Sequence, residues 1–317
     1  MGNRIVGYGS MNFANILRSI DITGEGVGRT SVVKAESFTW LNIVFGLIWL
    51  YDSWSSLSPH HKAEMSAFFG LSMDSALLHL VVALTAFVRI ALAASLLSGR
   101  GLRVMGWVGV AYSLYIWLVV ENGGDFGDDA TDPGLGLPYL VVFLYVLGAE
   151  RLRTEPDINR NFLLALARIV FGLLWTYDAI LKFEPAFLSH FLDYLTGAQK
   201  DAPGWMAAYD QFWIALTTLV GPLLMAIAVG VAEVAIAIGL LSGRGLRVLG
   251  PIGLALSFVI WSAPESWGGP YSHGITTMSM RLIGTAVIYM LAFGYLWVLY
   301  NPLDLVHRAR RAGVHAT

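Results

Sequence analysis

The sequence contains no cysteine, which excludes disulfides, thiolate metal sites, iron-sulfur clusters and cysteine nucleophiles from this chain. Charged residues are also scarce, because they make up 13% of the 317 residues, roughly half of the share in a typical soluble protein. The net charge of only -2 disfavours binding to nucleic acid. Any redox chemistry therefore requires a bound cofactor or a partner.

Apolar residues take the place of the missing charges. They form 56% of the chain and raise its mean hydropathy to +0.63, which indicates an integral membrane protein. Runs long enough to cross about 30 Å of hydrocarbon predict an all-α protein with eight transmembrane helices, at 38–56, 76–98, 102–120, 137–150, 162–182, 222–242, 246–263 and 280–300. Pro222 is expected to separate the sixth helix from an interfacial segment at 210–220, because proline suits the start of a helix.

The distribution of positive charge predicts the orientation. With both termini in the cytoplasm, the cytoplasmic segments hold fourteen Lys and Arg residues and the opposite segments hold four. This asymmetry satisfies the positive-inside rule and favours the inner, cytoplasmic membrane, with membrane lipid as the surroundings. The two remaining cations, Arg89 and Arg168, lie within predicted helices.

An internal repeat divides the chain. The sequence VFGLIWLYD at 44–52 returns as VFGLLWTYD at 170–178, and LLSGRGLRVMG at 96–106 returns as LLSGRGLRVLG at 240–250. Glu121-Asn-Gly-Gly likewise returns as Glu265-Ser-Trp-Gly-Gly. We therefore expect two tandem four-helix bundles in the same orientation, at 38–150 and 162–300, joined by a cytoplasmic linker at 151–161. The segments 1–37 and 301–317 are expected to be a cytoplasmic extension and a basic cytoplasmic tail.

The second copy resembles the four-span DoxX/DoxD family. The resemblance rests on Arg168-Ile-Val-Phe-Gly172, on Trp175, Asp178 and Lys182 after it, on Glu233 ahead of Gly239-Leu-Leu-Ser-Gly-Arg244, and on Gly268-Gly269 and Arg281-Leu-Ile-Gly284. It covers most of 162–300 and extends weakly over 38–150. It implies a four-helix bundle for each copy and a membrane subunit similar to that of thiosulfate:quinone oxidoreductase, which passes electrons from thiosulfate to quinone.

The first copy departs from this pattern. Asn42 stands where the second copy has Arg168, Ser56 where it has Lys182, and Arg89 where it has Glu233. We therefore expect any chemistry to belong to the second half, with the first half as its structural partner.

Three charged residues lie at similar depth inside predicted helices: Arg89, Arg168 and Glu233. A charge exposed to lipid costs at least about 2.5 to 3.5 kcal/mol, so these side chains are expected to turn inward and to pair, with both arginines sharing Glu233. One interpretation is an ion cluster that joins the two halves. The other is a proton relay or a contact with a quinone headgroup.

Near the outer face, Asp178 and Lys182 share one side of a helix. Together with His273 and Arg281, Lys182 is predicted to form a basic pocket for a small oxyanion or a quinone carbonyl, and Trp175 and Tyr177 are expected to contact the quinone. The alternative is that the cations are membrane anchors and that the histidine is a solvated loop residue. Haem is not expected, because no predicted helix holds a pair of histidines, and no metal-binding spacing is present.

The leading hypothesis is therefore a quinone-linked oxidoreductase subunit that works with other protein subunits. The competing one is a non-catalytic scaffold or anchor of a larger membrane complex. A transporter or channel is a third class, but the sequence lacks the interrupted helices expected of one.

Overall fold

The structure is a computed structural model that describes residues 34–124, 132–152, 161–200, 202–268 and 284–300. These residues form helices and connecting turns and contain no β-strand. The α-helices are α2 (Lys34–Ser55), α3 (Pro59–Phe69), α4 (Ala76–Ser98), α5 (Leu102–Tyr115), α6 (Gly136–Arg151), α7 (Phe162–Leu181), α8 (Pro185–Lys200), α9 (Gly204–Val220), α10 (Pro222–Ser242), α11 (Leu246–Ser262) and α12 (Thr285–Tyr300). A π-helical turn at Ile116–Val120 extends α5, and a 3-10 turn at Ser266–Gly268 follows α11.

Within the described ranges, four helical segments are long and apolar enough to cross a membrane: α4, α5 with its π turn, α7 and α10. Helices α11 and α12 are apolar but shorter. Each of the eight predicted segments contains a helix, although α2 begins at Lys34, ahead of the predicted start. The expected break at Pro222 is confirmed, because α9 ends at Val220, Gly221 adopts a φ of 101°, and Pro222 is the first residue of α10.

The sequence repeat recurs in the packing. Helix α2 packs on α4 and α5 on α6, while α7 packs on α10 and α11 on α12. Each half contains one ring cluster at equivalent positions, made of Phe45, Trp49, Tyr139 and Phe143 in the first half and Phe171, Trp175, Tyr289 and Phe293 in the second. The two phenylalanines of each cluster lie 4.8 Å and 4.7 Å apart between ring centroids. The repeated sequence therefore forms the same side-chain contacts twice.

Glycine allows the helices within each half to approach closely. A Cβ atom at Gly109 on α5 would lie 2.3 Å from the ring of Phe143, and one at Gly253 on α11 would lie 2.2 Å from the ring of Phe293. Any side chain at either position would collide with the ring cluster. These two glycines therefore fix how deeply α6 and α12 sit against their neighbours.

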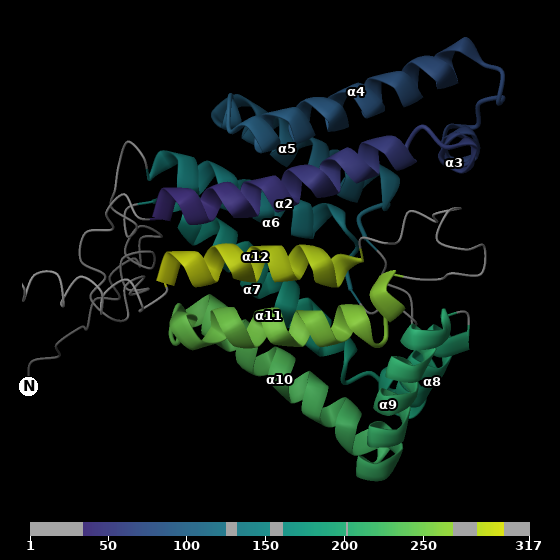
Figure 1. The fold of residues 1–317 in the computed structure, drawn as a ribbon, viewed down its shortest axis with the longest axis vertical. Helices are drawn as coiled ribbons and strands as arrows, with labels where there is room; N and C mark the ends of the chain where they lie inside the picture. The colour runs from purple at the N-terminus through teal and green to yellow at the C-terminus, as the bar shows by residue number, and fades with distance from the viewer. Residues whose placement is uncertain (1–33, 125–131, 153–160, 201, 269–283, 301–317) are drawn as a thin grey trace, which may run out of the picture.

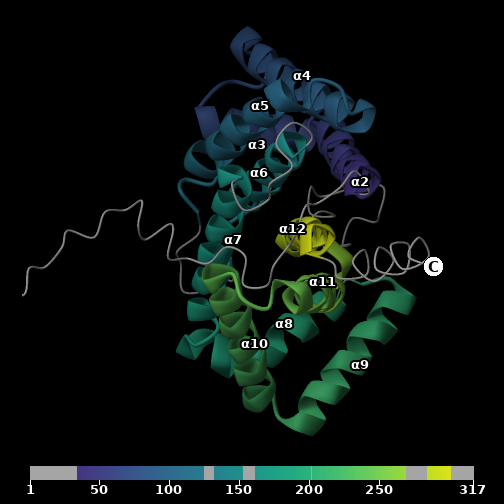
Figure 2. The same cartoon turned by 90° about the vertical axis from the view of Figure 1, so that its left-hand side faces the viewer.

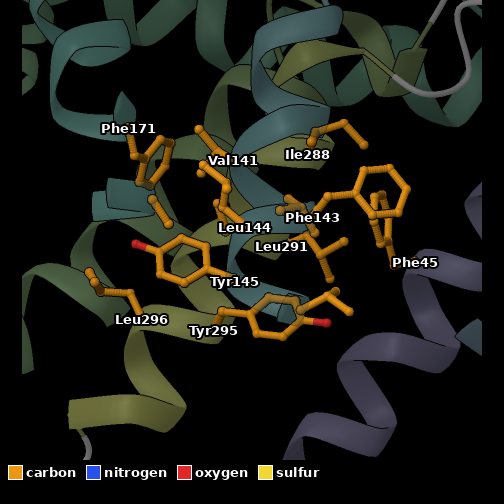
Figure 3. Packing of buried hydrophobic residues seen from close by; sticks show 14 of the residues in the cluster. Phe45, Val141, Phe143, Leu144, Tyr145, Phe171, Ile288, Leu291, Tyr295 and Leu296 are labelled. Carbon is orange, nitrogen blue, oxygen red and sulfur yellow. The ribbon is translucent and has the colours of Figure 1, made fainter. Parts of the chain in front are cut away.

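Helices α6 and α12 lie at the centre of the protein, between α4 and α5 at one end of its long axis and α8, α9 and α10 at the other (Figure 1). Both are buried almost all round, as expected for helices that are apolar on every face. Tyr145 of α6 and Tyr295 of α12 lie at the centre of the buried cluster (Figure 3) and stack, with 5.9 Å between their ring centroids. The Tyr295 hydroxyl donates to Asn42 of α2. The centre therefore joins the two halves through both rings and a buried hydrogen bond.

The second half contains a helix with no counterpart in the first. One helix, α3, lies between α2 and α4, whereas α8 and α9 both lie between α7 and α10. Helix α9 stands at an angle to α10 and α11 at one end of the molecule (Figure 2). Its Asp210 accepts a hydrogen bond from Ser266 at 3.1 Å, and its Tyr209 shares one with Ser262 at 2.8 Å. These contacts fasten the additional helix to the end of α11.

Candidate functional site

The second half encloses a cavity of about 190 Å³ between α7, α8, α9, α10, α11 and the start of α12. Aromatic and aliphatic side chains form most of its wall, including Trp175, Phe187, Trp213 and Tyr289. Its ionisable lining residues are Asp132, Asp178, Lys182, Glu233 and Glu265, with Tyr194 and Tyr289 as phenols. A mostly apolar cavity with a few convergent polar groups is the usual form of a small-molecule site.

Lys182 and Glu233 form the charged pair of this cavity. The Lys182 Nζ atom lies 3.9 Å from Glu233 Oε2 and 5.1 Å from the centroid of the Phe187 ring. Asp178, one helical turn before Lys182, interacts electrostatically with both members of the pair. All three charged residues are buried. Among the described residues, neither Asp178 Oδ1 nor Glu233 Oε2 has a hydrogen-bond partner, so both oxygens are available to a molecule in the cavity.

Two further carboxylates lie where α11 ends and α12 begins. Glu265 accepts a hydrogen bond from the backbone of Ala286, and its Oε2 atom is buried without a partner among the described residues. Burial, reinforced by the nearby Asp132, raises the pKa of Glu265 to about 7. Asp132 comes from the segment before α6 in the first half and accepts a hydrogen bond from Thr285 at 3.2 Å. The cavity therefore uses residues from both halves.

The first half fills the equivalent position with side chains. Arg89, which replaces Glu233, lies 3.4 Å from the carboxylate of Asp52 on α2. Its Nε atom donates to the Tyr112 hydroxyl at 2.9 Å, and its guanidinium also lies 5.8 Å from the centre of that ring. The second half has the shorter Leu256 at the position of Tyr112. Arginine and tyrosine thus occupy this position in the first half, whereas glutamate, leucine and the added helix α9 line the cavity in the second.

The pairing expected between the arginines and Glu233 is wrong. Glu233 pairs with Lys182, and Arg89 pairs with Asp52 within its own half. The buried Arg168 donates instead to the carbonyl oxygens of Leu240 and Leu241 in the last turn of α10, the second at 3.1 Å. A cation at the C-terminal end of a helix is stabilised by the free carbonyl groups there. Arg168 is therefore not part of the cavity.

Some of the remaining predicted site residues line the cavity and others do not. Trp175, Asp178, Lys182 and Glu233 line the cavity, whereas Tyr177 is half-buried and does not. His273 and Arg281 lie outside the described residues, so the predicted basic pocket is represented only by Lys182. Among the described lining residues of the cavity, the ammonium of Lys182 lies with four acidic side chains.

Glu265 and Asp132 are the charged cavity residues that sequence reasoning missed. The repeat contained a signal for Glu265, because its counterpart Glu121 follows α5 in the same way. No sequence signal indicated that Asp132 of the first half would reach α12 of the second.

No cluster of three or more histidine, aspartate or glutamate side chains suited to a metal ion occurs in the described ranges. Comparison of the chain with protein-family models, with curated proteins and with solved structures yields no match.

Proposed function

We propose that the chain is a quinone-linked membrane oxidoreductase subunit whose second-half cavity holds the quinone headgroup. The observation that carries this proposal is an apolar, aromatic-lined cavity with one ammonium and several carboxylates among helices of membrane-spanning character. A quinone ring requires flat apolar walls, a hydrogen-bond donor for a carbonyl oxygen, and proton donors for its reduction.

The cavity residues suit these requirements. The rings of Trp175 and Tyr289, whose centroids lie 5.3 Å apart, offer an apolar surface on one side. Lys182 is the ammonium able to donate to a carbonyl oxygen, and its Nζ atom lies 3.9 Å from Glu233. Asp178 and Glu233, which line the cavity beside Lys182, are groups able to supply protons.

The acidic side chains of the cavity favour different sites for the quinone and for the sulfur oxyanion that reduces it. Among the described lining residues, a sulfur oxyanion such as thiosulfate would meet four acidic side chains and one ammonium, which disfavours its binding. We therefore assign oxidation of the oxyanion to another subunit of the complex, which passes electrons to the quinone. In this arrangement the chain supplies the quinone site and protons.

We also propose that all eight predicted helices cross the membrane, with the two four-helix bundles in the same orientation and both termini in the cytoplasm. The presence of a helix at each predicted segment and the fourteen-to-four charge asymmetry support this topology. The shorter α11 and α12 fit if they tilt little or lie where the bilayer is thinner.

Quinone binding to the purified full-length chain tests the proposal. A short-tailed quinone is expected to quench the fluorescence of tryptophans near the cavity, such as Trp175 and Trp213. Lys182→Met should weaken binding by at least about tenfold, because a hydrogen bond from a charged donor contributes about 1.5 to 3 kcal/mol. Ser56→Ala, at the equivalent position of the first half, is the matched control and should leave the affinity within about threefold, roughly 0.65 kcal/mol.

Two outcomes would contradict this function. If quinone does not bind, or if Lys182→Met binds it as tightly as the parent chain, the cavity is not the quinone site. If complex assembly nevertheless requires the chain, the scaffold function takes its place.

A further inference from the structure

We propose that Glu265 exchanges protons between the second-half cavity and the aqueous edge of the membrane. This inference rests on the proposed function, because it assigns the source of the protons that a quinone takes up there. Glu265 lies beyond the end of α11, outside the helical segments, yet lines the cavity that those segments enclose. Its place in the chain is thus between the cavity and the end of the helices that enclose it.

Glu265 and its counterpart in the first half, Glu121, differ in their hydrogen-bond partners. Glu121 occupies the equivalent position in the first half, where its two oxygens accept hydrogen bonds from the backbone of Leu135 at 2.7 Å and of Gly136 at 3.0 Å. Both oxygens thus satisfy the otherwise unpaired amides at the start of α6. Glu265 has a backbone partner in Ala286, whereas its Oε2 atom has none among the described residues. One oxygen of Glu265 is therefore available to carry a proton.

Several charged or titratable groups from the surrounding elements line the same cavity as Glu265, and two of them, Asp132 and Lys182, interact with it electrostatically. These groups are Asp132 from the first half, Asp178 and Lys182 from the end of α7, Glu233 from α10 and Tyr289 from α12. Asp178 Oδ1 and Glu233 Oε2 are buried without hydrogen-bond partners among the described residues. The carboxyl groups of one cavity thus provide successive positions for a proton between Glu265 and the interior.

A partner subunit supplies the electrons for reduction of the quinone. Reduction of a quinone to a quinol takes up two electrons and two protons, and each carbonyl oxygen becomes a hydroxyl. The electrons come from the subunit that oxidises the sulfur oxyanion. Glu265 passes its proton inward to the carboxylates of Asp178 and Glu233, and water at the membrane edge returns one to it. The pKa of Glu265, raised by burial to about 7, keeps both of its protonation states populated near neutral pH.

Modification of the intact parent chain by an apolar carbodiimide tests the inference. Carbodiimides add to protonated carboxyl groups in apolar surroundings, and peptide mass spectrometry identifies the modified residue. Glu265 is expected to react, and its rate should fall by about tenfold for each pH unit above 7, as the protonated fraction falls. Glu121 is the matched control within the same molecule, and its rate should be at least about tenfold lower because both oxygens are engaged.

The outcomes separate this inference from the proposed function. Reaction at Glu265 with the stated pH dependence supports proton exchange, whether or not quinone binds in the fluorescence titration. If Glu265 reacts no faster than Glu121, or if its rate does not change with pH, Glu265 is a structural cap of α12 and the inference is wrong. In that case a positive quinone titration would leave the proposed function intact.

Discussion

The ion pair between Arg89 and Asp52 leads to a quantitative prediction about the first half. The Arg89→Met substitution keeps much of the side-chain length and removes the charge. At 3.4 Å the two charges attract each other by about 5 kcal/mol at an effective dielectric constant of about 20. Loss of one member of a buried pair typically costs about 3 to 5 kcal/mol, because the other charge stays buried without compensation. We expect about 3 kcal/mol, since 20% of the Asp52 side chain is exposed.

The assay is reversible unfolding of the purified chain in mixed micelles, followed by circular dichroism as the denaturing detergent is increased. The double variant Arg89→Met/Asp52→Leu should recover most of the lost free energy, because two apolar side chains replace a charged pair at little net cost. Arg103→Met, on the exposed side of α5, is the control and should change stability by less than about 0.5 kcal/mol. A single variant as stable as the parent chain, or a double variant less stable than the single, would refute the reasoning.

Three further predictions concern packing, pH and topology. Gly253→Ala should destabilise the chain by about 1 to 3 kcal/mol, because its Cβ would lie 2.2 Å from a ring of α12. The control Gly197→Ala lies in open space on α8 and should stabilise the chain by up to about 1 kcal/mol. Equal effects of the two substitutions in the same unfolding assay would contradict the close packing of α11 and α12. Between pH 4.5 and about 7 the folded chain keeps the Glu265 proton that the unfolded chain has lost. The free energy of unfolding should therefore fall by about 3 kcal/mol as pH rises through this window. Glu265→Gln should abolish that fall when unfolding is measured across pH. A reporter fused to the carboxyl end should be cytoplasmic and one in the loop between α5 and α6 should be outside; a cytoplasmic signal from that loop would eliminate the eight-helix topology.

The helices were predictable because apolar runs and polar turns are local properties of the sequence. The repeat also predicted which helices would be equivalent, and the start of α10 at Pro222 followed from the backbone restriction of proline. The pairing of the buried charges was not predictable from depth alone. Depth along a helix says nothing about the side of the helix on which a residue lies, and Arg89 faces Asp52 in its own half.

The repeat contains part of the information about how the buried charges pair. Asp52 and Asp178 are equivalent positions. The second half has Glu233 at the position of Arg89, so it lacks the cation opposite the aspartate. It has Lys182 at the position of Ser56, which supplies a cation at the end of α7 instead. The cavity itself also includes Asp132, which comes from a segment of the first half that is distant in the sequence. Such long-range packing leaves no local pattern in the residues concerned.

The stacked tyrosines at the centre have a consequence for how the two sites diverged. Tyr145 and Tyr295 are equivalent residues of the repeat, so this contact is one in which a position meets its own counterpart, as at the axis of a two-fold symmetric dimer. In a dimer of identical chains every substitution would appear in both subunits, and a glutamate in place of Arg89 would leave two acidic sites. Fusion into one polypeptide removes that constraint. One copy holds a charge pair while its twin holds the substitutions that line the cavity, and the ratio of the two is fixed at one to one by translation.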